Sequence, residues 1–216
     1  MDRFANAKGF IFDCDGTLLD TISAWDDAER DLFLQTGPLT QEQEDKIHSA
    51  PIEQAAELFH ELGAGESAQD VLAHLDGFLL EYYRDKADPM PGACECVRAI
   101  RARGIPCVVL SSSPRRYLEA GLRRAGILDC FCELISTDEV GASKQDDAIY
   151  EHAEKVLGAD RADIWAVDDA PYAVGIMASF GFQTIGVAGG CSKERRRQLQ
   201  DHADLVVETL CDLLPS

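Results

Sequence analysis

The sequence predicts an α/β fold, with a Rossmann-like parallel sheet core that carries helices on both faces and an inserted α-helical unit. Short apolar runs bounded by turn residues alternate with helical patterns along most of the chain. This alternation is typical of right-handed crossovers, which place helices on both faces of a parallel sheet. It stops between residue 21 and about residue 88, where only helical patterns occur. We therefore expect an α/β core of residues 1–20 and 89–216 and a helical unit of residues 21–88.

Five apolar runs are expected to form buried strands, and a weaker sixth run an edge strand. They cover residues 9–13, 106–111, 131–135, 163–168 and 183–187, with the weaker run at 204–207. The core helices are expected over residues 92–103, 114–125, 145–158 and 171–181, and those of the helical unit over 23–36, 40–48, 51–62 and 67–86. Several core helices end at a glycine, as helix C-termini prefer. In such folds ligands bind beyond the carboxyl ends of the strands.

The overall composition is that of a folded globular protein. Hydrophobic residues make up 46% of the chain and charged residues 27%. The 39 acidic and 20 basic residues give a net charge of −19, which repels nucleic-acid phosphates and anionic lipid surfaces. We therefore expect neither nucleic acid nor a membrane as a partner. The arginine clusters are expected to lie on solvated helix faces and have no assigned function: Arg115-Arg116, Arg123-Arg124 and Arg195 to Arg197.

The sequence predicts a cytoplasmic protein, present as a monomer or a weak dimer. It contains neither a signal-type apolar stretch nor a run of about 18 apolar residues that could span a bilayer. Eight cysteines are expected to stay reduced, because disulfide frameworks are typical of small secreted chains.

Two aspartates follow the first apolar run, in the stretch Asp13-Cys14-Asp15-Gly16-Thr17. Alternate side chains of an extended segment share a face, so Asp13 and Asp15 are expected to point into one cleft and Cys14 away from it. Two carboxylates about 4 Å apart repel by about 4 kcal/mol at an effective dielectric of about 20. They need a cation, a shared proton or strong donors, and Mg²⁺ is the natural cation for hard oxygen ligands.

Three further polar groups follow other predicted strands. Ser111 ends the strand 106–111, and the helix start after it could bind an anion, although such serines are also common helix caps. Lys144 precedes the helix 145–158, from where its ammonium could reach the same cleft; a lone loop lysine is otherwise solvated. Asp168 ends the strand 163–168 and Asp169 follows it, where an acidic pair could also cap the next helix.

The order of these motifs resembles the four-motif pattern of the haloacid dehalogenase-like hydrolase superfamily. The pattern is Asp-x-Asp-Gly-Thr, a strand-end serine, a lysine and an acidic pair, and the resemblance covers nearly the whole chain. The helical insert after the first motif is similar to the small cap of the phosphoglycolate phosphatase and β-phosphoglucomutase branch. The resemblance implies Mg²⁺-dependent hydrolysis of a small phosphorylated metabolite, under a helical cap that closes over the cleft and sets substrate specificity.

The resemblance also implies a role for each motif residue. Asp13 would be the nucleophile that forms an aspartyl-phosphate, and Asp15 would protonate the leaving oxygen and then deprotonate water. Mg²⁺ would be held by Asp13, the backbone carbonyl of Asp15 and Asp169, with support from Asp168. The substrate phosphate would contact Ser111, Ser112 and Lys144.

Within the superfamily, phosphatase activity is the first expectation and sugar phosphomutase activity the alternative, followed by a binding protein without turnover. Asp15 favours phosphate transfer over dehalogenation, because dehalogenases lack the second acid. Mutases of this branch carry a histidine five residues after the aspartate at position 20, where this chain has Trp25, a possible residue of the leaving-group pocket. Around Lys144 the chain reads Lys144-Gln145-Asp146-Asp147-Ala148 and lacks the prolines of the usual Lys-Pro-x-Pro-Asp pattern, which would stiffen this loop. His48, His60 and His74 are expected to be solvated or core residues.

Overall fold

A six-stranded parallel sheet forms the centre of the protein. The computed structural model describes residues 4–140 and 143–214. The strands are β1 (Gly9–Phe12), β2 (Cys107–Ser111), β3 (Glu133–Ser136), β4 (Ile164–Asp168), β5 (Gln183–Val187) and β6 (Leu205–Val207). Their order is β3-β2-β1-β4-β5-β6, and every neighbouring pair is parallel. The predicted parallel α/β core is therefore confirmed, and the weak sixth run lies at an edge as expected.

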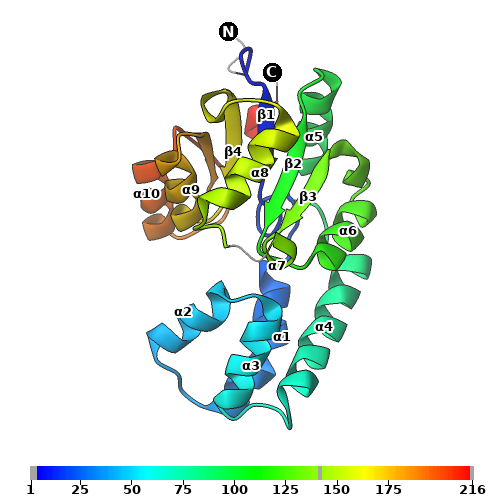
Figure 1. The fold of residues 1–216 in the computed structure, drawn as a ribbon, viewed down its shortest axis with the longest axis vertical. Coiled ribbons are helices and arrows are strands. Elements are labelled where there is room, and N and C mark those ends of the chain that lie inside the picture. Colours follow the sequence, from blue (N-terminus) through cyan, green and yellow to red (C-terminus); the bar gives the residue numbers. More distant parts are fainter. Residues whose placement is uncertain (1–3, 141–142, 215–216) are drawn as a thin grey trace.

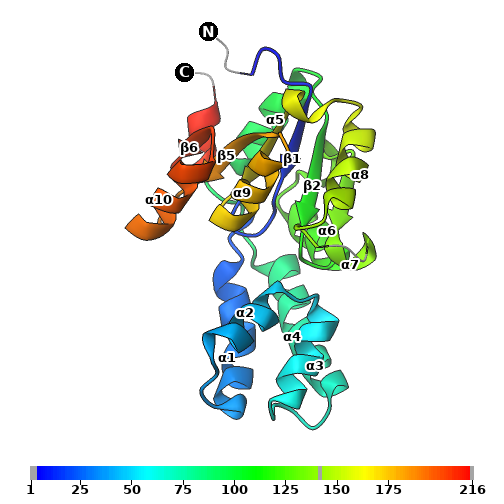
Figure 2. The ribbon, with the colours of Figure 1, turned by 60° about the vertical axis from the view of Figure 1, so that its left-hand side comes forward.

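Helices cover both faces of the sheet (Figures 1 and 2). One face packs on α5 (Ala93–Ala102) and α6 (Arg115–Arg124). The other packs on α8 (Asp147–Leu157), α9 (Pro171–Ser179) and α10 (Lys193–His202). Successive side chains of β1 point to opposite faces of the sheet. Phe10 and Phe12 pack in the apolar cluster on the face of α5 and α6, and Ile11 packs in the cluster on the face of α8 and α9.

Short helices complete the core. They are α7 (Thr137–Val140) and the 3₁₀ turns η1 (Leu128–Cys130), η2 (Arg161–Asp163) and η3 (Leu210–Leu213). The sequence patterns did not predict them, because each is only three or four residues long and shows no helical period.

Four helices form the unit beyond the carboxyl ends of the strands (Figure 1). They are α1 (Ile22–Thr36), α2 (Gln41–Ser49), α3 (Ile52–Glu61) and α4 (Ala68–Asp85). Thr40 begins α2 with a capping box, and the Ser67 hydroxyl caps α4 by accepting from the Asp70 N–H. We call α1–α4 the helical unit; its status as a separate domain of residues 21–88 stays a prediction.

The chain crosses between the core and the helical unit at two adjacent segments. The Asp20 N–H donates to the Asp88 carbonyl at 2.9 Å, and the Met90 N–H donates to the Leu18 carbonyl at 2.9 Å. In addition α4 packs along α6, so the helical unit also contacts the core through a helix pair (Figures 1 and 2).

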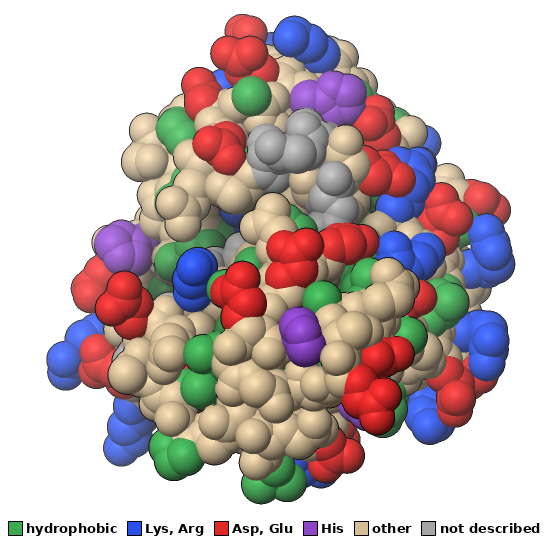
Figure 3. Space-filling model, turned by 60° about the horizontal axis from the view of Figure 1, so that its bottom comes forward, with side chains coloured by type: hydrophobic (Ala, Val, Ile, Leu, Met, Phe, Trp, Pro, Cys, Tyr) green, Lys and Arg blue, Asp and Glu red, His purple; other side chains and the backbone are tan. Residues whose placement is uncertain are grey.

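Acidic side chains are spread over the face that carries the helical unit (Figure 3), in line with the net charge of −19. No helix among the described residues has both the length and the apolar composition that a membrane span needs.

Candidate functional site

A pocket of about 420 Å³ lies between the carboxyl ends of the strands and the helical unit. Asp13 and Asp15 of the first motif both line this pocket. Since β1 ends at Phe12, one residue before the expected end, both aspartates lie in the loop after the strand. Cys14, between them, is fully buried in the apolar core, so the expected opposite orientation is confirmed. The core side of the pocket is lined by Asp13, Asp15, Ser111, Ser112, Ser113, Lys144, Asp168, Asp169, Ala170, Tyr172 and Arg195.

Lys144 connects the first aspartate to the acidic pair. Its Nζ lies 2.7 Å from Asp13 Oδ1 and 2.8 Å from Asp168 Oδ2, and the lysine is only 6% exposed. The Tyr150 hydroxyl donates to the Lys144 carbonyl at 2.8 Å, which fixes the backbone of this loop without the prolines that relatives carry. The lysine is therefore a buried site residue rather than a solvated one.

Asp169, the second residue of the acidic pair, contacts Arg195 of α10. Its Oδ2 accepts from Nη2 of Arg195 at 2.6 Å, and its backbone carbonyl accepts from the same guanidinium. Gly16 has a φ of +80°, and a Cβ there would come within 2.8 Å of Asp169 Oδ2. Glycine is thus required both by the backbone conformation and by the approach of this carboxylate.

Asp13, Asp168 and Asp169 form the group of carboxylates that could bind a metal ion. One oxygen from each lies within 4.8 Å of the others. The side chain of Asp15 does not belong to this group, and a contribution of its backbone carbonyl stays a prediction.

The electrostatics of the group favour a cation. Burial raises the pKa of Asp13 well above its usual value, and Lys144 opposes that rise. Burial and then the charge of Asp168 raise the pKa of Asp169 to about 6, against the effect of Arg195. Burial would lower the pKa of Lys144, but Asp13 and Asp168 hold it well above its ordinary value. The lysine is therefore charged, and the raised pKa values of Asp13 and Asp169 mean that a further cation beside them would stabilise their ionised forms.

Asp15 is held by four hydroxyl groups. Its Oδ1 accepts from Thr21 at 2.6 Å and from the Tyr83 hydroxyl. Its Oδ2 accepts from Ser113 at 2.7 Å and from Ser111 at 3.2 Å. A carboxylate offers about four lone-pair positions, so all of those on Asp15 are taken.

The predicted phosphate serines lie beside this carboxylate. Ser111 is buried, and its Oγ accepts from the Ser113 N–H at 3.0 Å, while Ser112 is exposed to the pocket. The loop therefore presents hydroxyl groups to the pocket just before α6.

Trp25 lines the pocket as predicted, and its Nε1 donates to the Tyr83 hydroxyl at 2.9 Å. His60 and His74 contact the backbone carbonyls of Ala64 and Ala28 within the helical unit and do not line the pocket. The side chain of His48 lies outside those that the structure describes.

Arg116 and Arg124 are exposed as expected, but one arginine of each cluster has a partner or a position that the sequence patterns did not predict. Arg195 lines the pocket, because α10 begins beyond the carboxyl end of β5. Arg116 pairs with Asp76 of α4 at 2.7 Å, and Arg124 pairs with Asp88 at 2.8 Å. Counting charges on a helix could not predict these partners, which lie in distant parts of the sequence.

The sequence patterns also missed three residues that bind Asp15 or its partners. Ser113 could have been found from its place in the Ser111-Ser112-Ser113 run, and Thr21 from its place just after the first motif. Tyr83 gave no signal, since it lies 68 positions from Asp15 along the chain.

Comparison with known proteins places residues 7–181 in the family described as haloacid dehalogenase-like hydrolases. The chain is 26% identical over 212 residues to the bifunctional riboflavin kinase/FMN phosphatase of Arabidopsis thaliana, covering 94% of this chain and 53% of that protein. It is 27% identical over 165 residues to hexitol phosphatase B of Escherichia coli, covering 74% of each. The crystal structure of β-phosphoglucomutase from Clostridium difficile shares the fold, with a TM-score of 0.74 at 18% identity over 96% of this chain and 93% of that one. The chain spans about half the length of the Arabidopsis protein and of two (S)-2-haloacid dehalogenases from Pseudomonas that it also matches.

Proposed function

Because this chain belongs to the haloacid dehalogenase-like hydrolase family, we propose that it hydrolyses a small phosphomonoester with Mg²⁺ as cofactor. The observation that carries the proposal is a second, hydrogen-bonded aspartate, Asp15, in the pocket of Asp13. Displacing an alkoxide from phosphorus requires a proton donor, whereas displacing a halide does not. The named phosphatases among the relatives support the same reaction class.

The donor set fits Mg²⁺. Three carboxylates, Asp13, Asp168 and Asp169, present oxygens within 4.8 Å of one another, and hard oxygen ligands are those that Mg²⁺ prefers. We propose that these residues and the backbone carbonyl of Asp15 hold the ion. When bound, Mg²⁺ would supply positive charge to the nucleophile and the phosphoryl oxygens.

Asp13 would attack the phosphorus and form an aspartyl-phosphate. Lys144, already 2.7 Å from Asp13 Oδ1, would offset the negative charge that this carboxylate and the phosphoryl group bring together. Ser111 and Ser112 would donate to the phosphoryl oxygens from the loop before α6.

Asp15 would give a proton to the leaving oxygen as the bond between that oxygen and phosphorus breaks. It would then take a proton from the water that attacks the aspartyl-phosphate, which releases phosphate and restores Asp13. Since its four acceptor positions are taken, one donor must leave before it can carry a proton. Ser111 makes the longest of these four contacts, 3.2 Å, and it is the residue proposed to bind phosphate. Phosphate binding would thus draw the Ser111 hydroxyl away and leave a position on Oδ2 for the proton.

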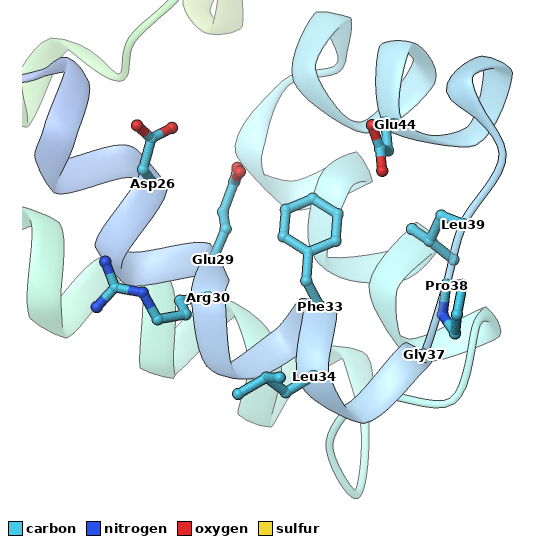
Figure 4. Close-up of a pocket in the computed structure, with 9 residues that line it drawn as sticks. All are labelled: Asp26, Glu29, Arg30, Phe33, Leu34, Gly37, Pro38, Leu39 and Glu44. Atoms are coloured by element: carbon cyan, nitrogen blue, oxygen red, sulfur yellow. The ribbon is translucent and has the colours of Figure 1, made fainter.

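The helical unit favours a monophosphate over the bisphosphate that a sugar phosphomutase must hold. Its side of the pocket is apolar except for Asp26 and Glu29, the charged residues among its described lining side chains. Asp26 and Glu29 also line an adjoining pocket of about 640 Å³, where their side chains project from the same side of α1 as Phe33 (Figure 4). A second phosphoryl group would face the carboxylate of Asp26 and be repelled. We propose that the helical unit acts as the cap and selects the leaving group.

A panel of phosphorylated metabolites tests the function directly. Phosphate release is measured with Mg²⁺ for the wild type and for Asp13→Asn, with a sugar 1-phosphate and its bisphosphate included to detect isomer formation. We expect free phosphate from at least one monoester with the wild type and none with the variant. Isomer in place of phosphate would support the mutase, and an active Asp13→Asn would rule out the proposed nucleophile.

A further inference from the structure

We infer that Tyr83, from the last turn of α4, is a positioning residue that holds the carboxylate of Asp15 in its working orientation. The inference rests on the proposed phosphatase function. It concerns a contact between the helical unit and the core, because Tyr83 belongs to α4 and Asp15 to the loop after β1.

The direction of the hydrogen bonds identifies Tyr83 as the donor. The indole N–H of Trp25 can only donate, and its Nε1 lies 2.9 Å from the Tyr83 oxygen. That oxygen therefore accepts from Trp25, and its own hydrogen is directed to Asp15 Oδ1. A tyrosine phenol keeps its hydrogen at neutral pH, so Tyr83 can donate it to Asp15.

The ring of Tyr83 is held in place by packing against the core. It is fully buried and stacks on Tyr117 of α6, with centroids 5.3 Å apart and an interplanar angle of 29°. Gly121 of α6 provides the space, since a Cβ there would lie 3.1 Å from Tyr83 Cδ1 and 2.5 Å from a Leu19 methyl group. The Tyr117 hydroxyl donates to Asp76 of α4 at 2.6 Å, which ties the same two helices together.

The two oxygens of the Asp15 carboxylate have donors from different parts of the protein. Oδ1 is held by Thr21 and Tyr83, at the junction with the helical unit. Oδ2 faces Ser111 and Ser113, on the phosphate side. Oδ1 is therefore the fixed end, and Oδ2 is the oxygen that exchanges the proton with the substrate.

Tyr83→Phe tests the inference, because it removes the hydroxyl and keeps the stacked ring. Proton donation matters for alkyl phosphates, whose leaving alkoxide is strongly basic, and little for p-nitrophenyl phosphate. We expect kcat/KM for an alkyl phosphate to fall by about tenfold, as for one hydrogen bond to a charged group, and kcat/KM for p-nitrophenyl phosphate to change less than about twofold. Equal losses on both esters, or no loss on either, would overturn the inference.

Tyr82→Phe is the matched control. Tyr82 precedes Tyr83 on α4, and within the described part of the chain its hydroxyl hydrogen-bonds only to the Asp20 carbonyl, at 3.4 Å. We expect its two kcat/KM values to match those of the wild type. A wild type that hydrolyses neither ester would refute the phosphatase proposal and this inference together, whereas an active wild type with equal losses in Tyr83→Phe would refute the inference alone.

A second readout does not depend on turnover. The protein has two tryptophans, Trp25 and Trp165, so two indole N–H resonances are expected in an NMR spectrum. The Trp25 resonance should shift in Tyr83→Phe, which removes its acceptor, and in Asp15→Asn, which removes the charge at the other end of the chain of hydrogen bonds. Trp165, in β4, should not shift. If the Trp25 resonance does not shift in Asp15→Asn, this would contradict the chain of hydrogen bonds from Trp25 through Tyr83 to Asp15.

Discussion

The guanidinium of Arg195 lies 2.6 Å from Asp169, one of the three carboxylates that could hold a metal ion. Nη2 contacts Oδ2, and both Nη2 and Nε contact the backbone carbonyl of Asp169. Arginine and Mg²⁺ would thus compete for the same carboxylate, and a positive charge beside the site also repels a second cation.

Arg195→Gln is therefore expected to strengthen Mg²⁺ binding. The Arg195 side chain is 41% exposed, so its ion pair is worth at most about 1 kcal/mol and the gain should be a few-fold in Kd. Isothermal titration with Mg²⁺ measures it. Arg196→Gln is the control, because Arg196 pairs with Glu208 instead. Weaker Mg²⁺ binding in Arg195→Gln would show that the arginine supports the site.

Lys144→Gln is expected to destabilise the metal-free protein by about 3 kcal/mol, because it leaves Asp13 and Asp168 buried without their cation. Urea unfolding measures the free energy, and added Mg²⁺ should recover part of the loss. Lys155→Gln, at an exposed position of α8, should change the free energy by less than about 0.5 kcal/mol. If the free energy of unfolding of Lys144→Gln were similar to that of Lys155→Gln, this would contradict the structural role of Lys144.

The raised pKa of Asp169 predicts how stability depends on pH. Burial raises this pKa from 3.8 to about 6, so the folded state binds the proton more tightly than the unfolded state does. The contribution of Asp169 to the free energy of unfolding is therefore fully present below the pKa that Asp169 has in the unfolded chain. It is lost as pH rises through about 6. Mg²⁺ requires the ionised carboxylate, so it should raise Tm more at about pH 8 than at about pH 5. An equal Mg²⁺ effect at both pH values would argue against Asp169 as a ligand.

The buried thiols should be unreactive. Burial raises the pKa of Cys96 to about 12, so almost no thiolate exists at about pH 8. Cys132 and Cys211 are exposed and should be alkylated first, while Cys14 and Cys96 should react only after unfolding. Mass spectrometry of the labelled peptides distinguishes them. Rapid labelling of Cys96 in the folded protein would contradict its burial.

The sheet and the motif residues could be predicted because local patterns specify them. An apolar run such as that at β1 and a strand-end acid such as Asp168 can be recognised in one stretch of sequence, and parallel topology then brings their carboxyl ends together. The loop lysine was harder, because only its contacts with Asp13 and Asp168 distinguish Lys144 from a solvated lysine.

The contacts between distant segments could not be predicted. Tyr83 reaches Asp15 because α4 packs on α6, and no spacing in the sequence specifies that packing. Arg195 belongs to a helix whose charged composition resembles a solvated face, yet the helix starts at the edge of the pocket. In both cases the helix was foreseeable and the partner of its side chain was not.

The most direct measurement looks for a phosphoryl group on Asp13. Asp15→Asn removes the proposed general base and should slow hydrolysis of the intermediate, while p-nitrophenyl phosphate, a good leaving group, still allows it to form. The reaction with Mg²⁺ is quenched in acid and digested, and the peptides are analysed by mass spectrometry, with Asp13→Asn as the control. We expect the phosphoryl group on Asp13 in Asp15→Asn and none in Asp13→Asn. A phosphoryl group on another residue, or none while the wild type releases phosphate, would contradict the aspartyl-phosphate mechanism.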